Sequence, residues 1–83
     1  MKLTVKYFAS IREAIGQGSE TVESSAATLG ALRDELIARG GAHAESLARG
    51  KAVRMAIDQV MQGEAATLAE GAEVAFFPPV TGG

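Results

Sequence analysis

The chain has 83 residues, of which 47% are hydrophobic, enough for one compact domain and too few for two. Its formal net charge is −2, and its eight Lys and Arg residues are scattered without the basic stripe that a nucleic-acid binder needs, so we expect no nucleic-acid ligand. The absence of cysteine excludes disulfides, thiolate metal sites and a thiol nucleophile.

Size and hydropathy exclude two further classes of protein. A chain this short does not easily enclose a deep catalytic cleft, so we expect any chemistry to need a partner. No segment approaches the roughly 18 apolar residues of a membrane-spanning helix, and the alternating N-terminal residues differ from the apolar run of a signal peptide. We therefore expect a cytoplasmic protein that makes no membrane contact.

The N-terminal part of the chain predicts two strands separated by a short helical segment. Residues 2–8 alternate between apolar and polar side chains, which is the period-2 pattern of a strand with one buried face. A short helical piece over residues 11–15 and a glycine-containing turn lead into a weaker strand over residues 20–23. The side chains of the first strand expected to face the core are Leu3, Val5 and Tyr7.

A longer helix is predicted to begin after Thr28, whose hydroxyl is a suitable N-cap, and to end at Gly40 and Gly41. Its apolar residues recur at the spacing of one helix face, which we expect to cover the sheet. These apolar residues are Leu29, Leu32, Leu36 and Ile37, and the residues expected to face water are Arg33, Asp34, Glu35 and Arg39.

The second half of the chain predicts the middle of the sheet. A helical turn is expected within residues 42–49, before the glycine that follows this segment. A strand is predicted over residues 52–57, where apolar side chains again alternate. The apolar pair Val60 and Met61 predicts a further short strand.

The last strand is predicted over residues 73–77 and ends at Pro78 and Pro79, because proline cannot donate a ladder hydrogen bond. The order of strand, strand, helix, strand, short strand and strand favours an α+β fold of the β-grasp type. This fold has a mixed sheet of about five strands, with one main helix packed on one face and the first and last strands adjacent and parallel. We predict a domain over residues 1–77 and an extended tail over residues 78–83.

The last eight residues carry the most specific motif in the chain, and they resemble the C-terminus of the MoaD/ThiS family of sulfur carriers. A terminal Gly-Gly alone would be a weak match, whereas two prolines directly after a predicted strand make the motif specific. The resemblance extends over the whole chain through the segments KYFASIRE, LGALRDELIARG, AIDQ and EGAEVAFFPPVTGG. It implies a ubiquitin-like β-grasp fold whose C-terminal end is the chemically active part.

The same resemblance implies a reaction at the carboxylate of Gly83. A MoeB-like adenylyltransferase would consume ATP to form a transient glycyl adenylate (glycyl-AMP), and a sulfur donor would convert it into a thiocarboxylate. The loaded tail would then enter the MoaE-like large subunit of molybdopterin synthase and donate sulfur to cyclic pyranopterin monophosphate. The family further implies a heterotetramer with the catalytic residues on the large subunit, and a carrier with no permanently bound cofactor and no metal.

The residue types of the tail suit this chemistry. Gly82 and Gly83 lack a β-carbon and can therefore thread a narrow channel into a partner. Pro78 and Pro79 would stiffen the tail base as a polyproline-like spacer of about 3.1 Å per residue, which lowers the entropy lost on insertion. The tail residues expected to contact the partner are completed by Val80 and Thr81.

Two phenylalanines are predicted to form an exposed patch for a partner. If Tyr7 faces the core, Phe8 points to the opposite face, and the same alternation turns Phe77 outward on the last strand. Because the first and last strands are neighbours in a β-grasp sheet, the two rings would lie together, with Val60 or Met61 extending the patch. The alternative is that the strand ends bend and both rings join the core.

Other interpretations stay open from the sequence. The alternatives are a protein modifier joined through Gly83 to lysines, a sulfur carrier for thiamine, thiolated tRNA or cysteine synthesis, and an interaction domain with an inert tail. His43 is interpreted as a surface residue, since a lone histidine makes no metal site. Arg12 could pair with an acidic group on a partner, but a solvated surface arginine is the more frequent case, and the same holds for Lys51 and Arg54.

Overall fold

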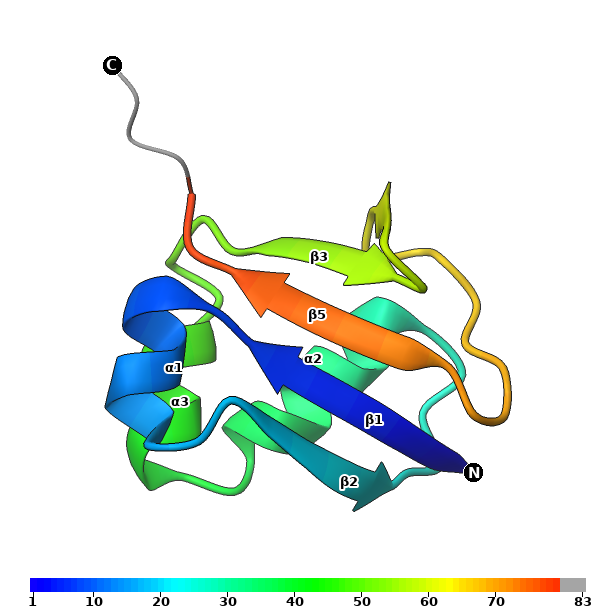
Figure 1. Ribbon diagram of the computed structural model, residues 1–83, viewed down its shortest axis with the longest axis horizontal. Helices are drawn as coiled ribbons and strands as arrows, with labels where there is room; N and C mark the ends of the chain where they lie inside the picture. The colour runs from blue at the N-terminus through cyan, green and yellow to red at the C-terminus, as the bar shows by residue number, and fades with distance from the viewer. Residues whose placement is uncertain (80–83) are drawn as a thin grey trace.

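The computed structural model of the protein describes residues 1–79. This part of the chain forms five strands and three helices (Figure 1). In chain order these are β1 (Lys2–Tyr7), α1 (Ala9–Ile15), β2 (Ser19–Glu23), α2 (Leu29–Ile37), α3 (Gly41–Leu47), β3 (Arg54–Ile57), β4 (Val60–Gln62) and β5 (Glu73–Phe77). Each predicted strand and helix is present, although α1 begins earlier than expected and β3 begins later.

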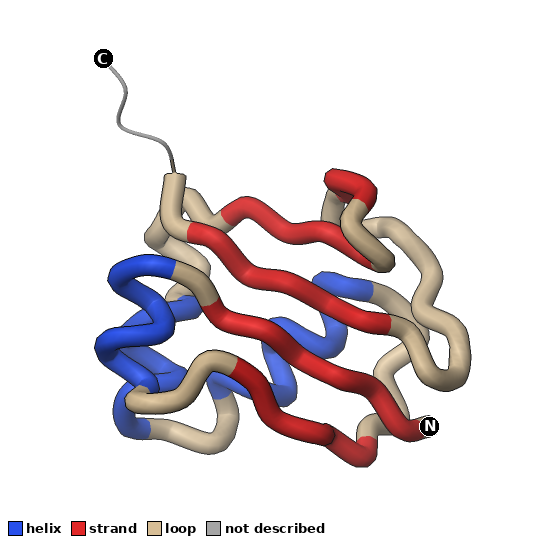
Figure 2. The backbone as a smooth tube through the Cα atoms, in the orientation of Figure 1, coloured by secondary structure: helices blue, strands red, loops and turns tan. Residues whose placement is uncertain are grey.

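The strands form one mixed sheet in the order β2-β1-β5-β3-β4 (Figure 2). The central strands β1 and β5 are parallel, and the other pairings in this sheet are antiparallel. The first and last strands are therefore adjacent and parallel, which confirms the predicted β-grasp order. In Figure 1, α2 crosses behind the sheet, while α1 and α3 pack on each other at one end of the strands.

The hydrophobic core lies between the sheet and the helices. On β1 and β5 the side chains that face this side are at most 1% exposed, and they are Leu3, Val5, Tyr7, Val74 and Phe76. The rings of Tyr7 and Phe76 are partners in the β1–β5 register and stack with centroids 6.2 Å apart. Burial of this apolar surface is the main favourable contribution to the free energy of folding.

The helix α2 covers the core as predicted. Thr28 is its N-cap, and the Thr28 hydroxyl accepts a hydrogen bond from the backbone N–H of Ala31 at 3.2 Å, which satisfies one free donor of the first turn. Leu29, Leu32 and Leu36 project to the core and are at most 1% exposed. The predicted apolar stripe is confirmed at these three positions.

The predicted exposure of Arg33 is wrong, because this residue is only 3% exposed. Its guanidinium donates hydrogen bonds to the carbonyl oxygens of Leu47 and Ala48, each at 2.7 Å, and of Lys51 at 3.0 Å. The carboxylate of Glu64 accepts a fourth bond at 3.2 Å. A charged group is tolerated in a buried position when its donors are paired in this way. Arg33 therefore joins the loop after α3 to α2.

The interpretation of His43 as a surface residue is also wrong, since its side chain is 13% exposed. His43 Nε2 lies 2.9 Å from the carboxylate of Glu20, which accepts two further hydrogen bonds, from Tyr7 at 2.6 Å and from Arg39 at 2.9 Å. Burial alone would raise the pKa of Glu20, but these hydrogen bonds outweigh it and lower the pKa to about 2. Glu35, also expected to face water, is half-buried.

Candidate docking face and tail base

The open face of the sheet carries a stacked pair of aromatic rings. Phe8 directly follows β1 and Phe77 ends β5, so the parallel register places their side chains together on the face opposite the core. The ring centroids are 4.7 Å apart and the ring planes differ by 9°. Phe8 is 39% exposed and Phe77 is half-buried. The predicted placement of both rings is confirmed, and the alternative that they join the core is wrong.

The backbone fixes Phe8 in this position from two sides. Its N–H donates to the carbonyl of Phe76 at 3.2 Å, which extends the β1–β5 ladder by one residue. Its carbonyl accepts the N–H of Ile11 at 3.1 Å at the start of α1. A turn begins at the next residue, Ala9, which has a φ of 50° and lies in the left-handed region. The ring of Phe8 is thus held outward by the turn from strand to helix.

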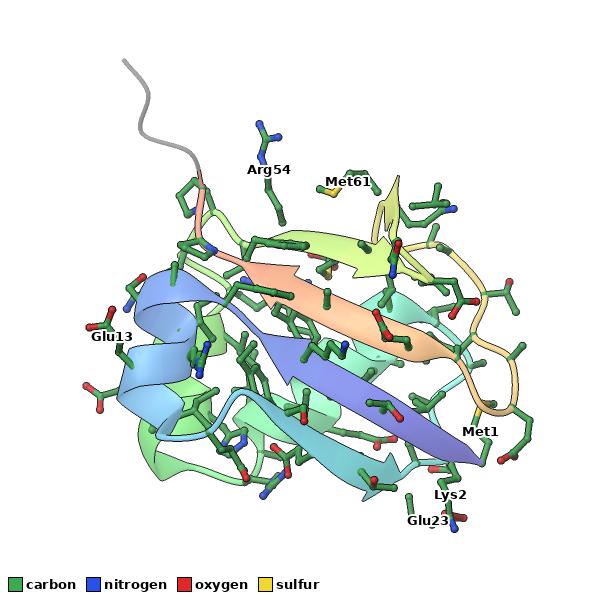
Figure 3. The ribbon with its side chains drawn as sticks, in the orientation of Figure 1. Met1, Lys2, Glu13, Glu23, Arg54 and Met61 are labelled. Carbon is green, nitrogen blue, oxygen red and sulfur yellow. The ribbon has the colours of Figure 1, made fainter. Side chains whose placement is uncertain are left out.

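The stacked rings form the floor of a groove of about 530 Å³, which we call the open-face groove. Arg54 reaches it from β3, where it is the register partner of Phe77, and Met61 reaches it from β4. Figure 3 shows the side chains of Arg54 and Met61 projecting at the β3–β4 side of the sheet. The residues that line the open-face groove are Phe8, Ala9, Arg54, Met61, Phe77, Pro78 and Pro79.

Val60 and Met61 differ in their relation to this groove. Both are exposed, at 56% and 53%. Met61 is paired with Ala56 and Val60 with Ile57, and Ile57 packs against the core, so Val60 lies on the opposite side of its strand from Met61. The structure therefore brings Met61 to the aromatic pair and does not bring Val60 there.

Pro78 and Pro79 stand between two grooves. Besides the open-face groove, they line a second groove of about 460 Å³ on the helix side of the molecule, which we call the helix-side groove. Its other lining residues are Ser10, Ile11, Ala14, Ser46, Lys51, Ala52 and Val53. The chain therefore leaves the described part of the fold where two concave surfaces meet. The predicted site residues Val80, Thr81, Gly82 and Gly83 lie outside the described residues.

Residues 1–79 contain neither a metal-binding cluster nor a membrane-spanning helix. Among residues 1–79 there is no group of three side chains that would suit a metal ion. The same part of the chain has no helix with the length and apolar character needed to span a membrane. Arg54 and Lys51, one in each groove, take part in none of the ion pairs within the described residues.

Two features of this region, the place of Arg54 and the helix-side groove, were not predicted from the sequence. Arg54 belongs to the open-face groove, and the alternation of β3 could have placed it there, because Met55 faces the core and its neighbour must face outward. The helix-side groove joins α1, the α3–β3 loop and the tail base, which are distant in the sequence. No local pattern could have predicted it.

These features define a ubiquitin-like β-grasp protein whose last strand leads directly from an exposed aromatic pair into the C-terminal segment. The ThiS family model matches residues 5–83, and the chain belongs to this family.

Known proteins resemble this chain over nearly its whole length. The molybdopterin synthase sulfur carrier subunit of Haemophilus influenzae is 41% identical, with 98% of this chain and 99% of the relative covered. The structure of a protein from Pyrococcus furiosus described as putative molybdopterin converting factor, subunit 1, superposes with a TM-score of 0.78 at 26% identity, covering 96% of this chain and 99% of the other. SAMP1 from Haloferax volcanii has a TM-score of 0.76 at 27% identity, with both chains fully covered at 100%.

Proposed function

We propose that this protein is the sulfur carrier of a molybdopterin synthase, with the carboxylate of Gly83 as the site that is loaded. The observation that carries this proposal is the 41% identity to a relative named for that role, over 98% of this chain and 99% of the relative. The family match also continues to residue 83, which supports a role for the C-terminal residues.

The proposed chemistry takes place in two steps on the carboxylate of Gly83. In the first, a carboxylate oxygen attacks the α-phosphorus of ATP on an activating enzyme, and pyrophosphate leaves. In the second, hydrosulfide released by a donor attacks the acyl carbon, AMP leaves with the bonding electron pair, and the S–H proton passes to solvent. The product is a thiocarboxylate whose sulfur is the group to be donated. The chain itself supplies the carboxylate. The two residues beside it, Gly82 and Gly83, have no β-carbon to obstruct an approaching enzyme.

The acceptor in this proposal is cyclic pyranopterin monophosphate, bound by a MoaE-like large subunit. The relative's name describes it as a subunit, which supports a partner subunit. We assign the open-face groove to this partner, because stacked aromatic rings beside an exposed methionine are typical of the centre of an interface. Pro78 and Pro79 would then direct the tail from the edge of the contact into the partner.

The test is intact-protein mass spectrometry after incubation with ATP, a MoeB-like activating enzyme and a sulfur donor. We expect a gain of about 16 Da, because sulfur replaces oxygen at the carboxylate of Gly83. A matched chain that ends at Gly82 serves as the control for the need for the second glycine. An unchanged mass of the intact chain in the complete reaction would contradict the proposal.

A second candidate function is a protein modifier, and one observation favours it. The structural relative SAMP1 is described for the same species as small archaeal modifier protein 1. In this function a lysine amine would attack the acyl carbon of the Gly83 adenylate, AMP would leave, and the amine would lose a proton as the isopeptide bond forms. Conjugates of this chain on lysines of other proteins, with no thiocarboxylate form, would favour the modifier. A thiocarboxylate that serves another acceptor would leave the carrier chemistry in place and change only the pathway.

A further inference from the structure

We propose that Arg54 is a specificity-determining residue of the open-face groove, and that it selects a partner whose docking surface carries an acidic side chain among apolar ones. The carboxylate of that side chain would pair with the Arg54 guanidinium when the partner covers the groove. This inference rests on the proposed function, because it adds a chemical requirement for the large subunit to which the open-face groove is assigned.

Arg54 occupies a distinct position in the open-face groove. Among the described residues that line the groove it is the one charged residue, and the other six are all apolar. Arg54 begins β3 and is the register partner of Phe77, so it stands beside the stacked rings at the end of the sheet where the chain leaves it. In Figure 3 its side chain extends outward from β3, on the same side of the sheet as Met61. A partner that packs on the rings therefore meets the guanidinium as well.

The charge of Arg54 has no counterpart within residues 1–79. The side chain is exposed and takes part in none of the ion pairs of this part of the chain. Three other arginines, Arg33, Arg39 and Arg49, each have a carboxylate within 3.2 Å. A guanidinium presents paired donors whose geometry matches a carboxylate, so Arg54 is suited to an acid from outside the domain.

The acidic groups of the strand pair β3–β5 lie at the opposite end of these strands. Glu73 begins β5, four residues before Phe77, which corresponds to roughly 13 Å along a strand. Its carboxylate lies 3.5 Å from the ammonium group of Lys6. The carboxylate of Asp58 accepts a hydrogen bond from the Glu73 backbone N–H at 3.0 Å. Both carboxylates therefore have partners within the domain, away from Arg54.

The apolar surroundings of Arg54 make an acidic partner group selective. Stacked aromatic rings, methionine and arginine together are the residue types enriched at the centres of interfaces. A partner that covers the groove excludes water, which strengthens the attraction between guanidinium and carboxylate. A partner without an acid at this point would leave the guanidinium desolvated and unpaired, which is strongly unfavourable. The same residue thus favours one class of surface and discriminates against another.

The first experiment measures binding to a molybdopterin synthase large subunit by isothermal titration calorimetry. Arg54→Met keeps an apolar stem and removes the charge, and it should weaken binding about tenfold. Arg54→Glu places a like charge against the partner's acid and should weaken binding about 100-fold. Lys51→Glu makes the same change of charge in the helix-side groove, and this matched control should stay within about twofold of the unchanged protein.

Two further measurements identify the partner group as an acid. Raising the salt concentration from about 50 mM to about 500 mM should weaken binding of the unchanged protein more than binding of Arg54→Met, because salt screens the ion pair. Arg54→Lys introduces an amine that a carbodiimide can join to a carboxylate in contact with it, the reagent taking up the water that is lost. Mass spectrometry of the cross-linked complex should then identify an Asp or Glu of the large subunit, and the unchanged protein should lack this product.

The outcomes separate this inference from the proposed function. If Phe8→Ala weakens binding and Arg54→Glu binds like the unchanged protein, the groove is the interface and Arg54 meets no acid, so the inference alone is overturned. Equal losses for Arg54→Met and Arg54→Glu would also overturn it, because only the packing of the side chain would then matter. Absence of binding by the unchanged protein would contradict the assigned docking face and this inference together. The affinities do not depend on thiocarboxylate formation, so a failure of the mass test leaves them interpretable.

Discussion

The two faces of the sheet use the same kinds of residue for different purposes. Phe76 faces the helices and is 0% exposed, whereas its neighbour Phe77 faces outward and stacks on a ring that is 39% exposed. On the inner face every large apolar side chain of β1 and β5 is covered by the helical layer. The open face has an apolar groove with no covering element among the described residues. One face thus supports the fold, and the other is available for binding.

Charged residues show the same contrast. Arg33 is 3% exposed and has its guanidinium donors paired with three carbonyls and a carboxylate. Arg54 is exposed at the rim of the open-face groove, without an ion pair among the described residues. The role of an arginine here depends on the face of the element that carries it, and not on residue type alone. Substitutions on the two faces should therefore separate stability from binding.

The largest expected effect comes from the inner face. Phe76→Ala should decrease the free energy of unfolding by about 3–5 kcal/mol, because it removes a fully buried ring and leaves a cavity. Phe77→Ala, the matched change on the next residue, should cost about 1–2 kcal/mol, since that ring is half-buried. Urea unfolding followed by circular dichroism measures both values. Equal losses for the two variants would break the distinction between the faces.

The buried arginine should give the next largest effect. Arg33→Met should decrease the free energy of unfolding by about 2–4 kcal/mol, because carbonyls after α3 lose their donors even though the apolar stem is replaced. The control Arg54→Met should stay within about 0.5 kcal/mol of the unchanged protein, as is usual for exposed sites. A small effect for Arg33→Met would mean that water replaces the guanidinium at those carbonyls.

The open face should show its importance in binding. Phe8→Ala should weaken binding to a molybdopterin synthase large subunit by about 30-fold, or about 2 kcal/mol, because it removes one of two stacked rings at the centre of the proposed contact. Val60→Ala is the control, since Val60 does not line the groove. Isothermal titration calorimetry gives the affinities. If both variants bind like the unchanged protein, the partner uses another surface.

The sequence predicted those parts of the fold that depend on local periodicity. The alternation in the first and last strands correctly placed Tyr7 inward and Phe8 and Phe77 outward, because neighbouring side chains of a strand face opposite sides. The N-cap at Thr28 was found for a similar reason, since its hydrogen bond reaches only three residues along the chain.

Contacts between distant segments were not predictable in this way. A polar position on α2 looks exposed until it is known that the loop after α3 presents carbonyls to it, so Arg33 was assigned to water. His43 was misplaced because its partner Glu20 lies on β2, 23 residues earlier. The helix-side groove depends on three separate segments and has no sequence pattern of its own.

The smallest effect we predict concerns the cluster around Glu20, at the edge of the inner layer. Hydrogen bonds from Tyr7, His43 and Arg39 outweigh the effect of burial and hold the pKa of Glu20 at about 2, below the unfolded value of about 4.3. Because the folded-state pKa is the lower one, the stabilisation is present above pH 4.3 and is lost as the pH falls toward 2. An ionised carboxylate only accepts hydrogen bonds, so His43 Nε2 must carry a proton in this cluster.

We expect the cluster to contribute about 1–2 kcal/mol at neutral pH, less than the pKa shift alone would give, because solvent reaches part of it. The measurement is the free energy of unfolding of the unchanged protein minus that of Glu20→Gln, from pH 7 to pH 2.5. This difference should stay constant down to about pH 5 and then decrease, since glutamine does not titrate. Taking the difference cancels the protonation of the other carboxylates. A difference that does not change with pH would mean that the three donors stabilise a neutral amide as well as a carboxylate, and the cluster would then act through its geometry and not through its charge.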